Sequence, residues 1–330
     1  MKWGIMATGS IAQKFASTVN RMTDEGEILQ AVASRTKESA ENFARQHRIP
    51  EVFDSYKAMA ESDSVDVIYI ATPNNMHYEN VKMCLLAGKH VLCEKPFTTS
   101  AAQAQELYAL AEEKGLFLME GFWIRFLPVL QKMQELIKEG KLGEIHYIRS
   151  EYGFVAKGDR KVRKFNPQLG GGALLDIGIY NLGFLNMIMG KNPDSFTSDV
   201  HMTDVGTDDF SVIHLHYPQE NGQGTQAVVT TAIGLDIQRK AAVIGTKGSI
   251  YLDDFQKAET MTVSLSDGEE YEIEIPFEIN GFEYQIREAS NCIREGRTQS
   301  SIYTPQMSLQ TLSLIDDIRA SWDMKFPFEK

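Results

Sequence analysis

A lysine at the end of a short apolar segment is one residue of this sequence whose type and position could do chemistry. His90 to Cys93 has the pattern of a buried strand, and Pro96 biases the preceding residue away from helix, so the strand must stop at Lys95. In open α/β sheets, ligands bind at the carboxyl ends of the strands. The sequence therefore predicts that the Lys95 ammonium faces a ligand, whereas the Lys-Pro pair taken alone is more typical of a surface turn.

Two further reactive side chains lie in an apolar segment of the second half of the chain. The segment from Gly170 to Leu182 is predicted to be one buried helix, and it carries Asp176 and Tyr180. Positions i and i+4 share a helix face, so the carboxylate and the phenol project together, and a buried carboxylate needs partners. The alternative is a structural aspartate and a core tyrosine. Taken with Lys95, the two residues are better explained as parts of a site.

The elements before Lys95 must position it, and they begin with a strand, a tight turn and a helix. Lys2 to Met6 is apolar, and apolar residues then repeat at helical spacing. The dinucleotide fingerprint G-x-G-x-x-G/A asks for small residues at three positions, which are here Ala7, Gly9 and Ala12. Ala7 replaces the usual glycine, so a left-handed conformation there would be strained. The pyrophosphate is expected at the helix N-terminus, with contacts from Ala7, Thr8, Gly9, Ser10 and Ile11.

The end of the predicted second strand, Ile28 to Ala33, is the position that meets the adenosine ribose in dinucleotide-binding domains. A carboxylate there binds the 2′-hydroxyl of NAD, whereas a hydroxyl and a guanidinium suit the 2′-phosphate of NADP. The residues that follow include Ser34, Arg35 and Lys37. The alternative is that the two cations are solvated residues at a helix start, although cations are unfavourable near a helix N-terminus. The sequence therefore favours NADP(H) over NAD(H).

Strands and helices alternate through the first 121 residues. Further strands are predicted at 52–53, 67–71, 90–93 and 116–119, with helices at 38–47, 56–61, 77–87 and 101–114. Such alternation predicts a parallel, doubly wound sheet of the Rossmann type. The predicted fold class is α/β, with a dinucleotide-binding domain at 1–121 and a second domain at 122–330.

The second domain has a different period. Apolar and polar side chains alternate at 146–152, 211–217, 262–265 and 271–275, and the segments 240–245 and 249–252 have the pattern of a hairpin. Alternation with one polar face predicts a mostly antiparallel, open sheet in an α+β domain. Helices are predicted at 129–139, 281–295 and 305–320.

Composition and charge argue against several classes of protein. The 330 residues are 43% hydrophobic and carry a formal net charge of -12, so we expect no binding to nucleic acid or to a membrane surface. No apolar run approaches the roughly 20 residues that span a bilayer. Cys84, Cys93 and Cys292 lack the spacing of a disulfide framework or a zinc site, so we expect no metal and a reducing cytoplasm. A strand that starts at the N-terminus leaves no room for a signal sequence.

Three motifs together resemble one family. The turn after the first strand, Thr72-Pro73-Asn74-x-x-His77 and Glu94-Lys95-Pro96 are similar to the motifs of the glucose-fructose oxidoreductase, inositol dehydrogenase and MocA-like (Gfo/Idh/MocA) family. The resemblance implies that Lys95 lies beside the nicotinamide and the substrate hydroxyl. It also implies that the cofactor cleft is lined by Thr72, Pro73, Asn74, His77 and Glu94. Without the resemblance, His77 would be interpreted as a helix-start residue.

The resemblance implies hydride transfer between a nicotinamide and a carbon that bears a hydroxyl group, with movement of the hydroxyl proton. Free tyrosine has a pKa of about 10, and a neighbouring ammonium lowers it, so Lys95 and Tyr180 are expected to form the acid/base pair. Asp176 would bind a substrate hydroxyl or orient that pair. Which of Lys95 and Tyr180 carries the proton stays open.

Tyrosine at position 180, where inositol dehydrogenases have histidine, resembles the dimeric dihydrodiol dehydrogenase and NADP-dependent aldose dehydrogenase branch. That resemblance implies a substrate pocket with Trp123, Arg125 and Phe126, and Arg163 is a further candidate. The alternative for the aromatic residues is packing at a domain junction. The expected substrate is a sugar, a cyclitol or a diol, and the direction of the reaction stays open.

Two further expectations come from the same resemblance. The second-domain sheet often pairs subunits in this family, so we expect a homodimer or a homotetramer. Some members bind NADP and a partner protein without turnover, so a non-catalytic NADP-binding regulator or sensor is the alternative function. Retention of both Lys95 and Tyr180 favours an enzyme.

Overall fold

The computed structural model describes residues 1–158, 163–218 and 224–329. The chain divides into two compact units. The first consists of Met1–Trp123 and Glu278–Ser308, and the second of Ile124–Phe277 and Leu309–Lys330. In the first unit, the segment Glu278–Ser308 joins the dinucleotide-binding residues near the N-terminus. The sequence-based division into 1–121 and 122–330 did not include this return of the chain to the first unit.

The first unit contains a six-stranded sheet in which all neighbouring strands are parallel. Its order is β3-β2-β1-β4-β5-β6, so the chain starts at the centre and winds outward to both edges. The strands are β1 (Lys2–Met6), β2 (Ile28–Ala33), β3 (Glu51–Phe53), β4 (Val67–Ile70), β5 (His90–Glu94) and β6 (Leu118–Gly121). This order confirms the predicted doubly wound Rossmann sheet. Lys95 follows directly on β5 and therefore leaves the sheet at the carboxyl end of a strand.

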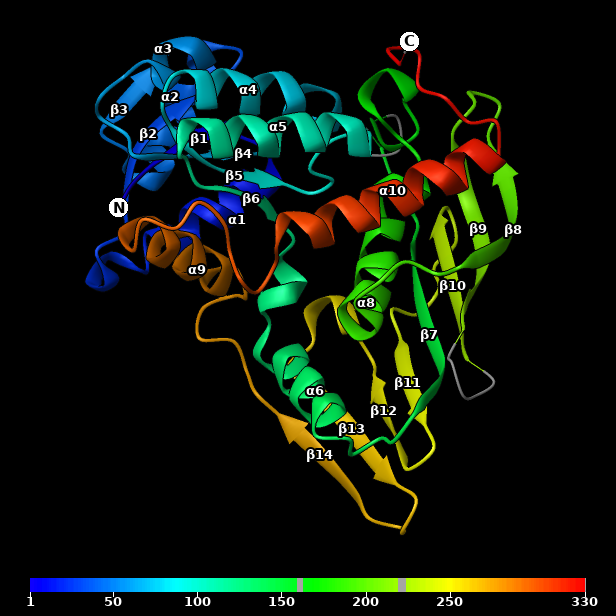
Figure 1. Cartoon of the computed structure of the whole chain (residues 1–330). Coiled ribbons are helices and arrows are strands. Elements are labelled where there is room, and N and C mark those ends of the chain that lie inside the picture. The colour runs from blue at the N-terminus through cyan, green and yellow to red at the C-terminus, as the bar shows by residue number, and fades with distance from the viewer. Residues whose placement is uncertain (159–162, 219–223, 330) are drawn as a thin grey trace. The chain divides into compact units, whose positions relative to one another are not determined.

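Helices cover both faces of this sheet. In Figure 1, α4 and α5 lie side by side on one face, and α1 and α9 lie on the other. Phe15 of α1 packs against the sheet, with its ring stacked on Tyr69 at 3.7 Å and edge-on to Trp3 at 5.2 Å between centroids. The helical segments are α1 (Ser10–Val19), η1 (Thr23–Glu25), α2 (Lys37–His47), α3 (Tyr56–Ala60), η2 (Asn74–Met76), α4 (His77–Leu86), α5 (Ala101–Lys114) and α9 (Glu283–Arg294). A further helical segment, η3 (Trp123–Phe126), lies where the chain passes from the first unit to the second.

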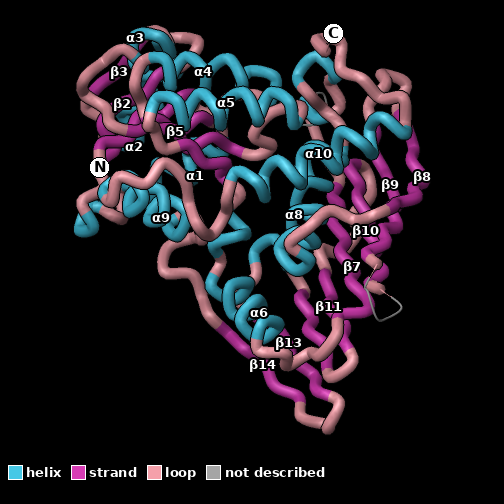
Figure 2. Tube along the Cα trace, in the orientation of Figure 1, coloured by secondary structure: helices cyan, strands magenta, loops and turns pink. Residues whose placement is uncertain are grey.

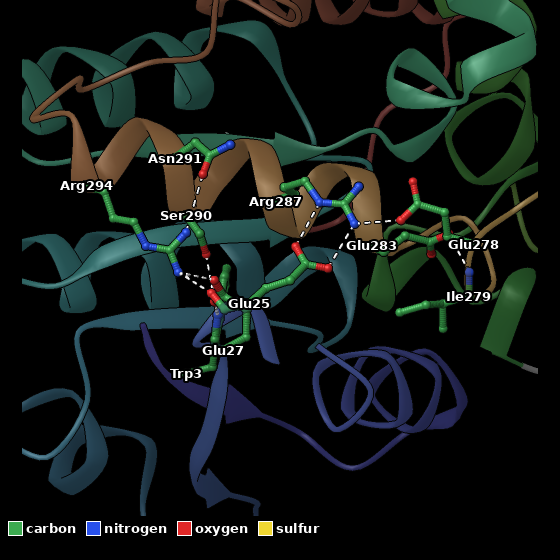
Figure 3. Close-up of polar contacts among 10 residues, drawn as sticks. All are labelled: Trp3, Glu25, Glu27, Glu278, Ile279, Glu283, Arg287, Ser290, Asn291 and Arg294. Atoms are coloured by element: carbon green, nitrogen blue, oxygen red, sulfur yellow. Dashed lines mark hydrogen bonds and ion pairs between the residues drawn. The ribbon is translucent and has the colours of Figure 1, made fainter. Parts of the chain in front are cut away.

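Buried polar contacts explain why α9 belongs to the first unit, far from its neighbours in sequence. Figure 3 shows Glu27, which lies just before β2, beneath this helix. Its side chain is 1% exposed and accepts hydrogen bonds from Trp3 Nε1 at 2.7 Å and Ser290 Oγ at 2.8 Å. Arg294 Nη2 lies 2.5 Å from the same carboxylate. A carboxylate buried to this degree requires such partners, and two of the three come from α9.

The second unit contains an eight-stranded sheet, drawn as magenta strands in Figure 2. Its order is β14-β13-β12-β11-β7-β10-β9-β8, and every pair is antiparallel except β7 with β10. The mostly antiparallel prediction is confirmed, although the strands predicted from sequence did not include β8 and β10. The strands are β7 (Ile145–Phe154), β8 (Ser195–Met202), β9 (Asp208–Tyr217), β10 (Thr225–Ile233), β11 (Ala241–Gly245), β12 (Gly248–Leu252), β13 (Thr260–Leu265) and β14 (Glu270–Glu274).

The apolar segment that carries Asp176 and Tyr180 departs from the prediction of one helix from Gly170 to Leu182. A glycine-rich turn comes first, a π-helical turn, η5 (Leu174–Gly178), follows, and the α-helix α8 (Ile179–Met189) begins only after it. The reason is tertiary, because α8 is buried on the strands through Asn181, which bonds Ser150 on β7 at 2.7 Å and Thr231 on β10 at 3.0 Å. The remaining helical segments are α6 (Pro128–Lys138), η4 (Pro167–Leu169), η6 (Phe255–Lys257) and α10 (Pro305–Ser321).

By length and composition, one described helical stretch, Pro167–Met189, could cross a membrane. Buried positions make up 83% of its apolar window, as is usual for the core helix of a globular domain.

Candidate active site

The turn after β1 has the features of a phosphate-binding turn. Ala7 has a φ of 85°, so it adopts the left-handed conformation for which its side chain is unfavourable, and its N–H donates to Ala33 O at 2.9 Å. Gly9 is the N-cap of α1, and no side chain caps the helix there. A Cβ added to Gly9 would meet no atom within 4 Å. Open space in front of uncapped N–H groups fits a pyrophosphate.

The residues predicted to select NADP lie together after β2. Ser34 is buried, and its Oγ lies 3.5 Å from Thr8 Oγ1 of the phosphate-binding turn. Arg35 and Lys37 are exposed, and Lys37 Nζ lies 3.9 Å from Glu41 in α2. Burial raises the pKa of Tyr56, and the charge of Arg35 opposes that rise, which places Arg35 near the start of α3. A hydroxyl beside the turn and a guanidinium on the surface fit a ribose 2′-phosphate.

His77 connects the two motifs that carry the family resemblance. Its side chain is fully buried, with Nδ1 2.8 Å from Pro96 O and Nε2 2.9 Å from Thr72 O. Burial lowers the pKa of His77, while the hydrogen bonds to the backbone carbonyls oppose that change. Thr72 is fixed a second time, because Asn80 Nδ2 donates to its Oγ1 at 3.1 Å. His77 therefore acts as a bridge between the segments at the ends of β4 and β5.

Glu94 and Lys95 have different surroundings although they are neighbours. Glu94 is buried and accepts a hydrogen bond from Tyr69 OH at 2.5 Å, inside the unit. Burial raises the pKa of Glu94 to about 7, against the opposing effects of the Tyr69 hydrogen bond and the charge of Lys95. Lys95 itself is partly exposed, and its bond to Pro96 is cis. Of the two, only Lys95 is open to a ligand from solvent.

The first unit adds polar groups that sequence reasoning missed. Lys14 Nζ lies 4.1 Å from the ring centroid of Trp123 and 4.3 Å from that of Phe282, so two aromatic faces hold one cation. Glu120, on β6, is buried and accepts hydrogen bonds from Tyr303 OH at 2.9 Å and Ser308 Oγ at 2.5 Å. Burial raises the pKa of Glu120. Spacing along the chain could not show these contacts, because each joins segments that are distant in sequence.

The second unit brings Asp176 and Tyr180 together with residues that were not predicted. Asp176 forms an ion pair with Lys164. Tyr180 is buried, and its ring centroid lies 6.0 Å from that of Tyr152 on β7. Lys164 Nζ also lies 5.0 Å from the ring centroid of Phe154. Asp176 and Tyr180 therefore lie in surroundings that combine an ion pair with aromatic rings.

The predicted substrate residues lie in two places. Trp123, Arg125 and Phe126 form η3 and are all buried, whereas Arg163 is exposed. A cavity of about 660 Å³ opens at the carboxyl end of β7, where Phe154 forms part of its wall. Its other lining residues are mainly charged and include Asp236, Arg239, Lys240 and Asp254.

Side chains that could ligate a metal do not cluster in the described part of the chain. Residues 1–158, 163–218 and 224–329 contain no group of three or more His, Cys, Asp or Glu side chains that could hold a metal ion. The three cysteines are buried and free, and burial raises the pKa of each thiol.

Comparison with known proteins agrees with this geometry. Residues 1–122 match the description "Oxidoreductase family, NAD-binding Rossmann fold", and residues 130–251 match the Gfo/Idh/MocA C-terminal domain. Similar curated proteins include the trans-1,2-dihydrobenzene-1,2-diol dehydrogenase of Xenopus tropicalis, 33% identical over 336 residues that cover 99% of each chain. The enzyme of the same name from Homo sapiens is 32% identical over 338 residues, with 100% of this chain and 99% of the other covered.

Solved structures show the same relationship. A 3-ketoreductase from Actinomadura kijaniata, in complex with NADP and TDP-benzene, has a TM-score of 0.85 and 26% identity over 97% of each chain. An aldose-aldose oxidoreductase from Caulobacter crescentus, complexed with glycerol, has a TM-score of 0.85 and 27% identity over 98% of each chain. The chain therefore belongs to the Gfo/Idh/MocA family of oxidoreductases and is a nicotinamide-dependent dehydrogenase or reductase.

Proposed function

We propose that this enzyme transfers a hydride between NADP(H) and a CH–OH or carbonyl carbon of a sugar, a cyclitol or a diol. The observation that carries the proposal is the position of Lys95, partly exposed at the carboxyl end of β5 between two buried neighbours, Glu94 and Pro96. The names of the similar proteins support the substrate class, because they act on a dihydrodiol, a keto group and aldoses. When bound, the nicotinamide supplies the hydride donor or acceptor.

The chain's own residues would bind the substrate and move its hydroxyl proton. We assign Lys95 and Tyr180 to the acid/base pair, because an ammonium lowers the pKa of a nearby phenol. Asp176 is assigned to a substrate hydroxyl, since a carboxylate is a strong acceptor. Trp123, Arg125, Phe126 and Arg163 remain proposed substrate residues, and the eight-stranded sheet remains the proposed surface for a homodimer or homotetramer.

The preference for NADP rests on the residues after β2. Ser34 and Arg35 offer a hydroxyl and a guanidinium, and the similar ketoreductase was crystallised with NADP. Replacement Arg35→Ala is expected to weaken NADPH binding by about tenfold or more while leaving NADH binding unchanged. Arg45→Ala, which removes an exposed arginine from α2, is the control. Fluorescence titration measures both nucleotides, and tighter binding of NADH than of NADPH to the wild type would reject the preference.

A screen of NADP-linked absorbance changes across aldoses, cyclitols and diols tests the activity. Lys95→Met and Tyr180→Phe are each expected to lower kcat by orders of magnitude while NADPH still binds. Lys57→Met, which removes an exposed lysine from α3, should behave as the wild type. Unchanged turnover in Lys95→Met would remove Lys95 from the mechanism. Nucleotide binding without turnover of any compound would favour the alternative, a non-catalytic NADP-binding regulator or sensor.

A further inference from the structure

The ion pair between Lys164 and Asp176 is a feature of the second unit that the proposed function does not use. Both side chains are largely buried, with 14% of Lys164 and 18% of Asp176 exposed. The Lys164 ammonium also lies over the face of Phe154, at 5.0 Å from its centroid. A lysine held this way has lost most of its hydration, so its charge acts strongly on the carboxylate beside it.

Backbone contacts fix the lysine close to the segment that carries Asp176. The N–H of Gly172 donates to the carbonyl oxygen of Lys164 at 2.8 Å. A Cβ on Gly171 would lie 2.5 Å from that same carbonyl oxygen, so a larger residue would push the two segments apart. Four residues after Gly172, Asp176 projects from the π-helical turn η5. Such turns are frequent at functional sites. Both members of the pair therefore extend from one tightly bonded turn.

Among the described residues, other titratable groups also lie near η5. They include two phenols and one carboxyl group, Tyr152, Tyr180 and Asp208, and the charge of Arg319 on α10 acts on Asp208. Burial raises the pKa of Asp208 to about 7. β10, which also packs here, carries no titratable side chain. Arg149 points to the opposite face of β7, where its Nε lies 3.8 Å from Glu151.

We propose that Lys164 is a positioning residue for Asp176. It holds the Asp176 carboxylate in one orientation and in its ionised form, so that the carboxylate accepts a hydrogen bond from a substrate hydroxyl. This inference rests on the proposed function, because it requires a hydroxylated substrate at Asp176.

Kinetics of matched variants test the proposal. Lys164→Met removes the charge at similar length, Lys164→Arg keeps the charge, and Lys157→Met removes an exposed lysine near the end of β7. With the substrate found in the screen, Lys164→Met is expected to lower kcat/KM by about 10- to 100-fold, mainly through KM, without weakening NADPH binding. Lys164→Arg should recover most of this loss, and Lys157→Met should match the wild type. An unchanged KM in Lys164→Met would overturn the proposal.

The pH profile separates positioning from simple packing. A nearby cation favours the ionised carboxylate, so its removal moves the titration of Asp176 to higher pH. The acidic limb of the kcat/KM profile is therefore expected at higher pH in Lys164→Met than in the wild type. In an Asp176→Asn background, the same substitution should not move this limb. Equal shifts in the two backgrounds, or no shift in either, would contradict the proposal.

Carboxyl ¹³C NMR gives a readout that needs no substrate. Labelled aspartate, with Asp176 assigned by the loss of its signal in Asp176→Asn, is expected to titrate at higher pH in Lys164→Met. If this shift occurs but no compound is turned over, the proposed function fails and the effect of Lys164 on Asp176 stands. If compounds are turned over without the shift, the positioning role fails and the proposed function stands.

Discussion

The Nδ1 atom of His77 lies 2.8 Å from the carbonyl oxygen of Pro96, which ties the start of α4 to the segment that follows β5. The same ring contacts Thr72 O through Nε2 at 2.9 Å. A side chain that the sequence suggests as a cofactor contact is thus fully buried between two backbone segments. Its effect on chemistry would be indirect, through the position of the residues that flank Lys95.

Replacement His77→Phe should destabilise the protein strongly, because it keeps a ring but removes the hydrogen bonding of a buried imidazole whose nitrogens contact two backbone carbonyl oxygens. We expect a loss of about 2 to 4 kcal/mol in the free energy of unfolding. Urea unfolding followed by tryptophan fluorescence measures this change. Tyr78→Phe, which removes an exposed hydrogen bond to Glu106 on the same helix, should lose less than about 1 kcal/mol. Equal losses in the two variants would contradict the bridging role of His77.

Replacement Ala7→Gly should stabilise the protein, because Ala7 has a φ of 85°. A left-handed conformation costs a non-glycine residue roughly 1 to 2 kcal/mol, part of which the greater freedom of glycine in the unfolded chain offsets. We expect a net gain of about 1 kcal/mol, measured by thermal unfolding. Ala12→Gly in helix α1 should have the opposite sign, with a loss of about 1 kcal/mol. A lower Tm for Ala7→Gly would show that the turn is not strained.

Asp208 should make stability depend on pH. Burial raises its pKa from 3.8 to about 7 in the folded state. The protonated Asp208 carboxyl group therefore contributes fully to the free energy of unfolding below about pH 4. This contribution is lost as pH rises through about 7, because Asp208 ionises at lower pH in the unfolded chain than in the folded protein. Asp208→Asn keeps an oxygen for the Leu174 N–H and removes this ionisation.

The comparison of Asp208→Asn with the wild type isolates this group from other titrating side chains. Between pH 5 and pH 8, the wild type should lose roughly 2 to 3 kcal/mol more free energy of unfolding than the variant. Urea unfolding at the two pH values provides the measurement. A difference between the two proteins that stays constant with pH would show that Asp208 titrates normally.

Two arginines on α9 should differ in importance although both form ion pairs with glutamates (Figure 3). Arg294→Met leaves the buried Glu27 without its cation, and we expect a loss of about 1 to 3 kcal/mol. Arg287→Met breaks pairs with Glu25 and Glu278, which are both well exposed, and should cost about 1 kcal/mol or less. Urea unfolding of the two variants tests this order, and a larger loss for Arg287→Met would contradict it.

The features that were predictable from sequence are those set by residues close together in the chain. Small residues at Ala7, Gly9 and Ala12 predicted the strand, turn and helix, and Pro96 predicted that Lys95 would end a strand. The left-handed conformation of Ala7 was expected to be strained, and the chain adopts it nevertheless. There the parallel sheet determines the path of the backbone, because Ala7 N–H continues the pairing of β1 with β2.

Features that depend on distant segments were not predictable. The pattern from Gly170 to Leu182 suggests a uniform helix, but the strands beneath it and Asp208 at its start favour a π-helical turn. No spacing rule connects Lys164 with Asp176 across a glycine-rich turn. Likewise, the apolar face of α9 predicted a buried helix, but only the contacts with Glu27 show which unit it joins.

The return of Glu278–Ser308 to the first unit has a consequence for biosynthesis. Ribosomes add roughly 5 to 20 residues per second, so on the order of ten seconds or more separate the emergence of Trp123 from that of Ser308. During this interval the nascent nucleotide-binding half lacks α9, and the carboxylate of Glu27 lacks two of its three partners. A nascent chain halted after Trp123 should therefore be more sensitive to protease than the same residues in the released protein.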